Sequence, residues 1–486
     1  MSAHPQTQIR KPQAASPDRR ASRLFWVAFA AILIGEVLDL LDSLVTTVAG
    51  PSILRDLGGS DALLQWLSAG YTLAMAGGVL IGGRLGDRFG RRRLFLIGMA
   101  GFTLASVIAA VSPTSEALLA ARVAQGLLGA LMLPQSMGLI RDIAGPERLR
   151  AAFGVFGVTL TASAIAGPIV AGFLVDADIF GLGWRAIFAI NIPLGIAGLV
   201  LGRRFLPASS PDRSLRIDVL GSLIALAMMI AIVFPLVEGR DAGWPWWAFA
   251  LLGLGVVLIG SFTVQQRARA AAGRDPLILP SLFGKRDFVA GIAVSLAFFT
   301  AFMSSAFVLA VLFQIGLGLS PLVAAGWMLP QAVGMIIGFK GAGRLLSGRR
   351  QLLVGFAVAG VGQALLVGVL LWQGASLQPW WLAPALLIAG AGAGAAMGPI
   401  FEVIMARLDE AETGSASGIL NAIQQVGGAT GVAAIGTVLF AVAAQYADPL
   451  LGVIRGATWA YGVSVVLVAA ALGLAAKLLP KSDQSA

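Results

Sequence analysis

Long apolar runs alternate with short polar segments from residue 24 almost to the end of the chain. A membrane-spanning helix needs roughly 20 mainly apolar residues. Fourteen runs of about this length follow one another, among them runs at 116–141 and 149–175 that a short polar segment separates. We therefore predict an all-α membrane protein with 14 transmembrane helices.

A weak internal repeat divides these runs into two halves. Trp66, Gly83-Arg84-Leu85 and Arg91-Arg92 recur as Trp327, Gly343-Arg344-Leu345 and Arg349-Arg350. Parallel halves with a substrate site between them are an established transporter plan. We expect a 6 + 2 + 6 arrangement: a disordered basic tail at 1–23, a six-helix bundle at 24–206, a two-helix insert with linkers at 207–286, a second six-helix bundle at 287–478 and a short tail at 479–486.

Charge supports a membrane protein and predicts its orientation. Hydrophobic residues make up 58% of the chain and charged residues 12%, against roughly 25% charged residues in soluble domains. The 34 Lys and Arg residues fall between the apolar runs, so the net charge of +10 does not indicate nucleic acid. Most of them lie on one side if both termini are cytoplasmic. We expect a multi-pass protein of a bacterial inner membrane, in contact with its lipid bilayer.

Several kinds of chemistry are excluded by composition. Cysteine is absent and the single histidine, His4, lies in the polar tail. Disulfides, thiol nucleophiles, histidine relays and cysteine or histidine metal sites are therefore not expected. The chain has no phosphate-binding glycine loop of the ATPase type and no catalytic constellation. We predict neither an enzyme nor a cofactor-dependent protein, and no metal site.

Three acids interrupt the first apolar run. Glu36, Asp39 and Asp42 follow one another at spacings of three, which places them on one stripe of a helix. Ionised groups at membrane depth are costly and usually face a protein interior or a water-filled cavity. The stripe predicts a proton or cation site, and nearby acids at such a site titrate together.

The segment after the second run carries the most specific motif. It reads Gly83-Arg84-Leu85-Gly86-Asp87-Arg88-Phe89-Gly90-Arg91-Arg92. Its glycines permit a tight turn, and Asp87 can pair with a neighbouring arginine or face a helix N-terminus. The segment resembles the signature loop of the major facilitator superfamily, in which it is a cytoplasmic latch for the outward-facing state. Arginines alone would also fit a simple topological anchor.

Further motifs resemble the fourteen-helix drug/proton antiporters of that superfamily. These are Leu41-Asp42 with Pro51, Arg122 with Gln125-Gly126 and Gly129, Trp184-Arg185 with Asn191 and Pro193, and the antiporter motif Gly154, Gly157, Gly167, Pro168 and Gly172, in which Ala171 replaces a glycine. The glycines also fit simple close packing of helices. The resemblance implies a major facilitator fold driven by the proton gradient without a cofactor.

The resemblance also assigns roles to charged residues. Asp42 takes the coupling position, Asp39 and Glu36 are additions to the family pattern, and Arg122 influences proton transfer. Two alternatives stay open for Arg122, which could snorkel to water or hold one of the acids in a permanent ion pair. Glu402 is another candidate for proton coupling, with a structural pair to Arg344 or Arg407 as its alternative.

A set of aromatic and amide side chains could line the cavity, although each could equally serve packing. The candidates are Trp66, Tyr71, Gln125, Gln135, Phe299, Met303, Trp327, Gln331, Asn421 and Gln424. Aromatic faces attract lipophilic cations, and methionine adapts to varied shapes.

Together these patterns predict a monomeric, proton-coupled exporter of lipophilic cationic drugs or antibiotics. Two other interpretations remain open. One keeps the fold but moves a neutral or anionic metabolite or a lipid, which the excess of acids disfavours. The other is a membrane receptor or scaffold without transport, which leaves the acid stripe unexplained.

Overall fold

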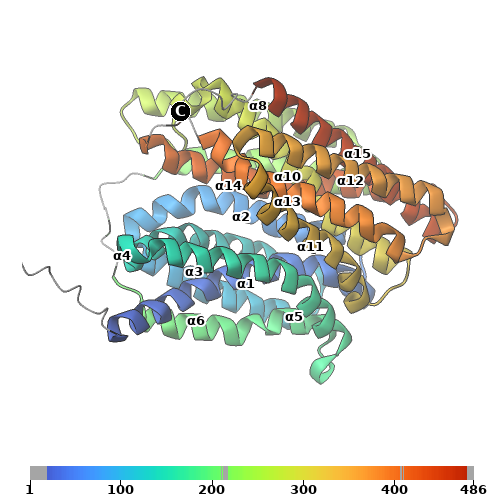
Figure 1. Cartoon of the computed structure of the whole chain (residues 1–486), viewed down its shortest axis with the longest axis horizontal. Coiled ribbons are helices and arrows are strands. Elements are labelled where there is room, and N and C mark those ends of the chain that lie inside the picture. Colours follow the sequence, from blue (N-terminus) through green and yellow to red (C-terminus); the bar gives the residue numbers. More distant parts are fainter. Residues whose placement is uncertain (1–18, 209–210, 212–216, 406–407, 409, 479–486) are drawn as a thin grey trace, which may run out of the picture.

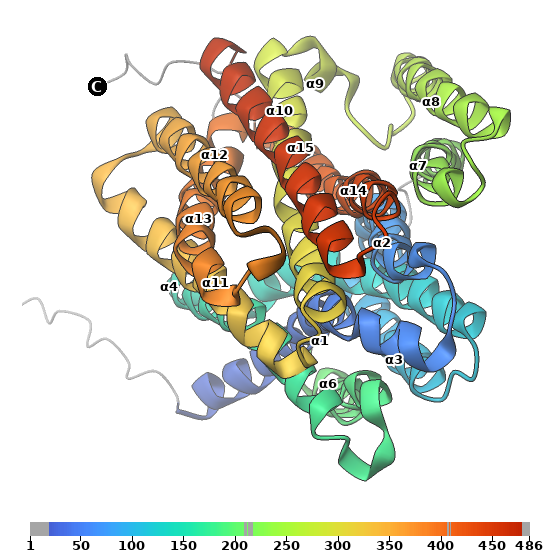
Figure 2. The ribbon, with the colours of Figure 1, turned by 90° about the vertical axis from the view of Figure 1, so that its right-hand side faces the viewer.

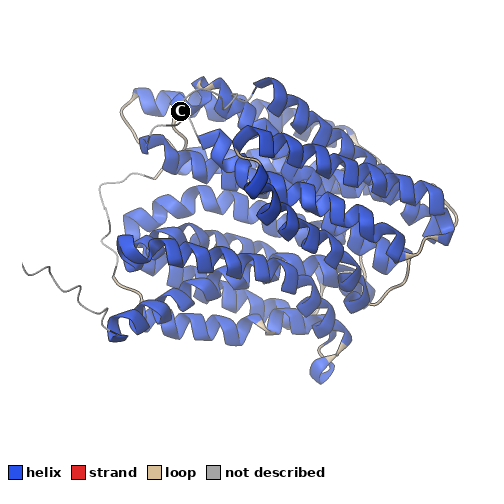
Figure 3. Cartoon of the chain, in the orientation of Figure 1, coloured by secondary structure: helices blue, strands red, loops and turns tan. Residues whose placement is uncertain are grey.

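The computed structural model describes residues 19–208, 211, 217–405, 408 and 410–478, and these contain helices but no strands (Figure 3). The α-helices are α1 (Arg19–Leu57), α2 (Asp61–Phe89), α3 (Arg91–Ala110), α4 (Ser115–Asp176), α5 (Ala186–Ala189), α6 (Asn191–Phe205), α7 (Val219–Asp241), α8 (Trp246–Ala271), α9 (Pro280–Gly284), α10 (Arg286–Ala310), α11 (Pro321–Leu345), α12 (Gly348–Gln373), α13 (Ala383–Met405), α14 (Glu410–Ala443) and α15 (Pro449–Leu478).

The helices form two bundles that lie side by side. Helices α1 to α6 make the lower bundle in Figure 1, and α10 to α15 make the upper one. Helices α7 and α8 lie at the edge: α7 packs beside α2 and α14, and α8 packs on α7 (Figure 2). Side chains of α7 share a buried apolar cluster with α2 and α14, including Met229, Leu73 and Ala429. The insert therefore packs across the boundary between the bundles.

Helix α4 contains two antiparallel segments. A straight helix of its 62 residues would be about 93 Å long at 1.5 Å per residue. Yet Leu118 near its start and Ala171 near its end belong to the same apolar cluster. The helix must therefore reverse direction between them, which agrees with the two runs predicted at 116–141 and 149–175.

Twelve described helices are long and apolar enough to span a membrane, or thirteen with α2, which bends by 46° between Val79 and Ile81. The second segment of α4 contributes a shorter apolar helix at Ala166–Asp176. The chain is thus an all-helical, multi-pass membrane protein, as predicted. The count of fourteen spans and the division into domains stay predictions. Residues 1–18 and 479–486, most of the predicted tails, lie outside the described residues, and α1 already begins at Arg19.

Glycines allow the helices of each bundle to approach closely. A Cβ atom at Gly126 of α4 would overlap the carbonyl oxygen of Tyr71 in α2. Small residues are expected at such contacts, because lipid provides no hydrophobic drive between helices. This contact brings Tyr71 together with the first segment of α4, and both contact the acid stripe of α1.

Candidate functional site

The three acids of α1 all face the interior of the N-terminal bundle. The residues Glu36, Asp39 and Asp42 are 8%, 7% and 1% exposed, respectively. Their neighbours are polar groups of α2, α4 and α6 rather than lipid, which is the environment that an intramembrane carboxylate requires.

Asp42 forms a buried ion pair with Arg122 of α4, which is fully buried. The Nε2 atom of Gln125 donates to Asp42 Oδ1 at 3.2 Å, and Asn191 Nδ2 donates to the same oxygen at 2.7 Å. Ser106 of α3 accepts from Gln125 at 2.9 Å. Such additional hydrogen bonds are needed to offset the desolvation of a buried ion pair.

Arg122 is held on several sides. Its Nε donates to the carbonyl oxygen of Leu67 at 3.3 Å, and its Nη1 donates to Gln125 Oε1 at 3.0 Å. The guanidinium carbon lies 4.2 Å from the centre of the Tyr71 ring, within cation–π range. With no exposed surface, Arg122 does not snorkel to water, so the snorkelling alternative is excluded.

The other two acids have different environments. Asp39 accepts a hydrogen bond from the Tyr71 hydroxyl, so Tyr71 contacts both Asp39 and Arg122. Glu36 lies beside Ser136, and no ion pair involves it among the described residues. Among the residues that the structure describes, Arg122 thus neutralises one of the three acids, and neither Asp39 nor Glu36 forms an ion pair of its own.

The segment from Trp184 to Asn191 forms hydrogen bonds with α1 at two positions, Asp56 and Asp42. Trp184 Nε1 and Arg185 Nη1 both donate to Asp56 Oδ2, at 2.8 and 2.7 Å. These hydrogen bonds lower the pKa of Asp56, which lies beyond the apolar part of α1. Asn191, at the start of α6, donates a hydrogen bond to Asp42 in the middle of α1. The sequence motif signalled Asn191 but gave it no site role, and nothing in the sequence signalled Ser106.

Two predicted lining residues of the N-terminal bundle have structural partners outside the acid cluster. Trp66 Nε1 donates to Glu238 of α7 at 2.5 Å. Gln135 Nε2 donates to the carbonyl oxygen of Gly82 at 2.7 Å, and its amide lies where a Cβ at Gly86 would be. Trp66 therefore ties the insert to α2, and Gln135 ties α4 to the end of α2.

The candidates in the C-terminal bundle are dispersed. Phe299 is buried against Gly427, and Met303 approaches Gly428, both at the contact of α10 with α14. Gln331 Nε2 donates to Ser305 Oγ at 3.2 Å. The remaining candidates are partly or fully exposed: Trp327, Asn421 and Gln424. Their role in substrate binding stays a prediction.

Glu402 does not join the acid cluster. It is exposed near the end of α13, in the other bundle. Arg407 and the side chain of Arg344, its predicted partners, lie outside the described residues. Its position gives no support for a shared proton site with Asp42.

The predicted latch segment is mostly helical rather than a loop. Helix α2 continues to Phe89 and α3 begins at Arg91. The turn consists of Gly90 alone, whose φ of 97° suits glycine. The tight turn that the glycines predicted is thus made by Gly90, whereas Gly83 and Gly86 lie within α2 and Gly86 makes a close contact with Gln135.

The charged residues of the latch segment connect it to its surroundings. Asp87 pairs with Arg91 at 3.1 Å across the Gly90 turn, and Arg91 also reaches Asp142 of α4 at 3.4 Å. Arg84 donates to the carbonyl oxygen of Pro276, in the linker after α8. Arg88 lies over the ring of Phe89. The predicted pairing of Asp87 with a neighbouring arginine is confirmed.

The structure describes mainly the last part of the antiporter motif, Gly167, Pro168 and Gly172. The surroundings of Gly154 and Gly157 are not among the described features. Gly167 is buried, and the helix continues through Pro168. A Cβ at Gly172 would lie 2.5 Å from Leu322 Cα in α11. This glycine thus permits backbone contact between the two bundles.

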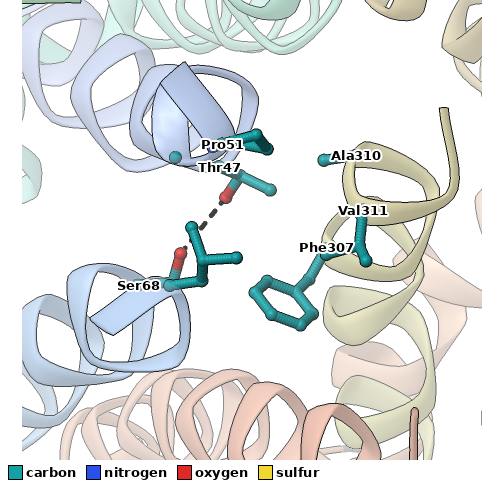
Figure 4. Close-up of a pocket in the computed structure, with 8 residues that line it drawn as sticks. Thr47, Pro51, Ser68, Phe307, Ala310 and Val311 are labelled. Atoms are coloured by element: carbon teal, nitrogen blue, oxygen red, sulfur yellow. Dashed lines mark hydrogen bonds between the residues drawn. The ribbon is translucent and has the colours of Figure 1, made fainter. Parts of the chain in front are cut away.

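The bundles also meet at α1, α2 and α10. Gln314, in a π-helical turn that follows α10, donates to the carbonyl oxygen of Val48 at 2.7 Å. Beside it, Thr47 and Ser68 face Phe307, Ala310 and Val311 across a cavity of about 10 Å³ (Figure 4). A space of this size holds one water at most.

The contact at Val48 involves the later part of α1, away from the start of this helix, which is its dark blue end at the lower left in Figure 1. On the same side, Asp176 at the end of α4 accepts from Ser320 Oγ at 2.6 Å and from the backbone of Leu322 at 3.1 Å. The bundles are therefore closed against each other on this side.

Comparisons with known proteins agree with this architecture. The family model described as Major Facilitator Superfamily matches residues 32–432. The probable actinorhodin transporter of Streptomyces coelicolor is 43% identical over 430 residues, covering 88% of this chain and 74% of the relative. The puromycin resistance protein pur8 of Streptomyces alboniger is 33% identical, covering 94% and 91%.

The fold agrees with solved structures as well. A crystal structure of a D-xylose-proton symporter superposes with a TM-score of 0.66 at 16% identity, covering 94% of this chain and 98% of the symporter. Other relatives include the multidrug efflux pump LfrA of Mycolicibacterium smegmatis, 29% identical over 90% of this chain and 86% of the pump. The chain belongs to the major facilitator superfamily, and its curated relatives include a probable antibiotic transporter, an antibiotic resistance protein and a multidrug efflux pump.

Proposed function

We propose that this protein is a proton-driven exporter of lipophilic cations or antibiotics in a bacterial inner membrane, with both termini cytoplasmic. The names of its relatives support export of antibiotics. The observation that carries the coupling is the buried stripe of three acids on α1, of which Asp42 pairs with Arg122. Buried acids without a full complement of bases can take up and release protons.

In this proposal Asp42 and Asp39 alternate between a proton and a cationic substrate. A proton on Asp42 removes the negative charge that pairs with Arg122, while the hydrogen bonds from Arg122 to Leu67 and Gln125 remain. The attraction between Asp42 and Arg122, which are both buried, therefore depends on whether Asp42 carries a proton. Because both residues lie between α1 and α4, a change in their attraction acts on the packing of these helices.

Substrate enters from the side of the termini in this proposal, because the bundles are closed on the other side. Opening requires loss of the Gln314 contact with Val48 and of the Asp176 contacts with Ser320 and Leu322. A proton arriving from the opposite side then exchanges for the substrate. Exchange of one proton for one monovalent cation supports about a tenfold cation gradient per pH unit.

Everted membrane vesicles test the function directly. With an acidified lumen, addition of a lipophilic cation such as tetraphenylphosphonium should collapse the pH gradient and accumulate the cation inside. Vesicles lacking the protein provide the control. If neutral or anionic metabolites collapse the gradient and no cation does, the substrate class is wrong. If the folded protein responds to no compound, the scaffold interpretation gains support.

A leucine at Gln314 is expected to favour opening on the side away from the termini. The substitution removes a buried hydrogen bond between the bundles, worth about 1 kcal/mol, or roughly fivefold in the equilibrium. Because the chain has no cysteine, a single cysteine at Thr47 can report the change through its labelling rate with a membrane-impermeant maleimide.

The matched control for this measurement is Gln373→Leu, at the end of α12, a helix that packs on α13 and α15. It should leave the labelling rate of the Thr47 cysteine unchanged. Equal rates in the Gln314 variant and the control would show that the Gln314 contact does not hold the closed state.

A further inference from the structure

A second pocket lies on the outer surface of the N-terminal bundle, at the side of the termini. Its volume is about 690 Å³. It opens where α2 ends, α3 begins and α6 ends. Its lining consists of Phe89, Gly90, Arg92, Arg93, Leu96, Ile97, Ala100, Leu199, Arg203 and Ala208. None of the site residues on α1 contributes to it, so the pocket is separate from the acid stripe.

The pocket is strongly basic at one end. Its lining includes three arginines and no acid. Arg92 donates to the carbonyl oxygen of Arg203, which fixes the start of α3 against the end of α6. Arg93 and Arg203 are exposed. The N-terminus of α3, whose cap Gly90 offers no side chain, adds the positive end of a helix dipole.

The other end of the pocket is apolar and is lined by residues of α3 and α6. Phe89 and Ile97 are 44% and 46% exposed, and both line the pocket. Beyond it, Ile196 and Val200 of α6 are also exposed. Both flanking segments, Arg91–Ala110 and Gly183–Phe205, are apolar enough to span the bilayer. Apolar side chains exposed on such helices face the acyl chains of lipid.

We propose that this pocket binds the headgroup of an anionic phospholipid, with the acyl chains lying along α3 and α6. Arginine pairs well with phosphate oxygens, and basic pockets between transmembrane helices on the cytoplasmic side suit anionic headgroups. The apolar walls favour a lipid over free phosphate, which has no group to cover Phe89 and Ile97. The site shares Gly90 and Arg92 with the latch segment, so the lipid lies directly beside the Gly90 turn.

Native mass spectrometry of the purified full-length chain tests this site. The protein is equilibrated with equal amounts of phosphatidylglycerol and phosphatidylcholine, and the lipids that remain bound are counted. The wild type should retain phosphatidylglycerol preferentially. The double variant R93Q/R203Q should lower that preference by about thirtyfold, at about 1 kcal/mol for each arginine.

Two variants control for charge and folding. R267Q/R274Q removes two exposed arginines at the end of α8 and just beyond it, and it should keep the wild-type preference. R93K/R203K keeps the positive charges and should retain most of the preference. Equal retention of both lipids by the wild type, or an equal loss in R267Q/R274Q, would overturn the proposal. So would displacement of bound phosphatidylglycerol by an equal concentration of inorganic phosphate, which would indicate a phosphate site instead.

Discussion

Replacement of Asp42 by asparagine is expected to abolish proton-driven accumulation of the substrate. Exchange of substrate across the membrane in the absence of a pH gradient should be retained. The carbonyl oxygen of asparagine can still accept hydrogen bonds from Gln125 and Asn191. Its amide nitrogen cannot accept from Arg122, and the side chain cannot gain or lose a proton. The cation gradient, about tenfold per pH unit in the wild type, should fall to the level of vesicles lacking the protein. Paired measurements of proton-driven uptake and of exchange between labelled and unlabelled substrate check this result.

The matched control is Asp56→Asn, which removes one acid from the same helix. Asp56 is half-exposed and pairs with Arg185, so its ion pair is worth at most about 1 kcal/mol. Proton-driven uptake should survive in this variant. Uptake that persists in the folded Asp42 variant would remove Asp42 from the coupling mechanism and direct attention to Asp39 and Glu36.

Replacement of Arg122 by alanine is expected to destabilise the protein severely. Removal of one partner of a buried ion pair leaves an uncompensated charge and typically costs about 3–5 kcal/mol. Here Asp42 would keep the neutral donors Gln125 and Asn191 but lose the guanidinium that pairs with it, and Tyr71 would lose the cation over its ring. Thermal unfolding in detergent at constant pH measures the loss of stability.

Two further variants separate the charge from the packing. The double variant D42N/R122A has no unpaired charge, so it should recover much of the stability lost in Arg122→Ala. The control Arg185→Ala removes a partly exposed arginine and should cost no more than about 1 kcal/mol. A double variant as unstable as Arg122→Ala would mean that packing around Arg122, rather than its charge, dominates.

The three acids have different neighbours, and we infer that they have different roles in the proposed cycle. Asp42 faces a base, Asp39 a tyrosine hydroxyl and Glu36 a serine. In the proposed cycle, protons reach Asp42 along this stripe, because each acid lies one helical turn from the next. Tyr71 contacts both Asp39 and Arg122 and would therefore respond to the protonation of Asp39 and to movement of Arg122.

The sequence by itself determined the membrane class, the family and the acid stripe. The length of each apolar run can be read from the sequence, and the thickness of a bilayer sets the length that a spanning helix needs. The runs therefore identify the membrane-spanning helices. The spacing of Glu36, Asp39 and Asp42 places them on one face of any α-helix, whatever packs against it. The latch motif and the motif around Arg122 were also recognisable, because their residues are contiguous in the chain.

Only the tertiary structure decided which groups meet. Arg122 could have paired with any of the three acids, and the packing of α4 on α1 selects Asp42. Asn191 and Ser106 join that pair from α6 and α3, and Trp66 turns towards Glu238 of the insert rather than towards the acids. These contacts join residues far apart in the chain, so they depend on how the helices pack, which local spacing and hydrophobicity do not specify.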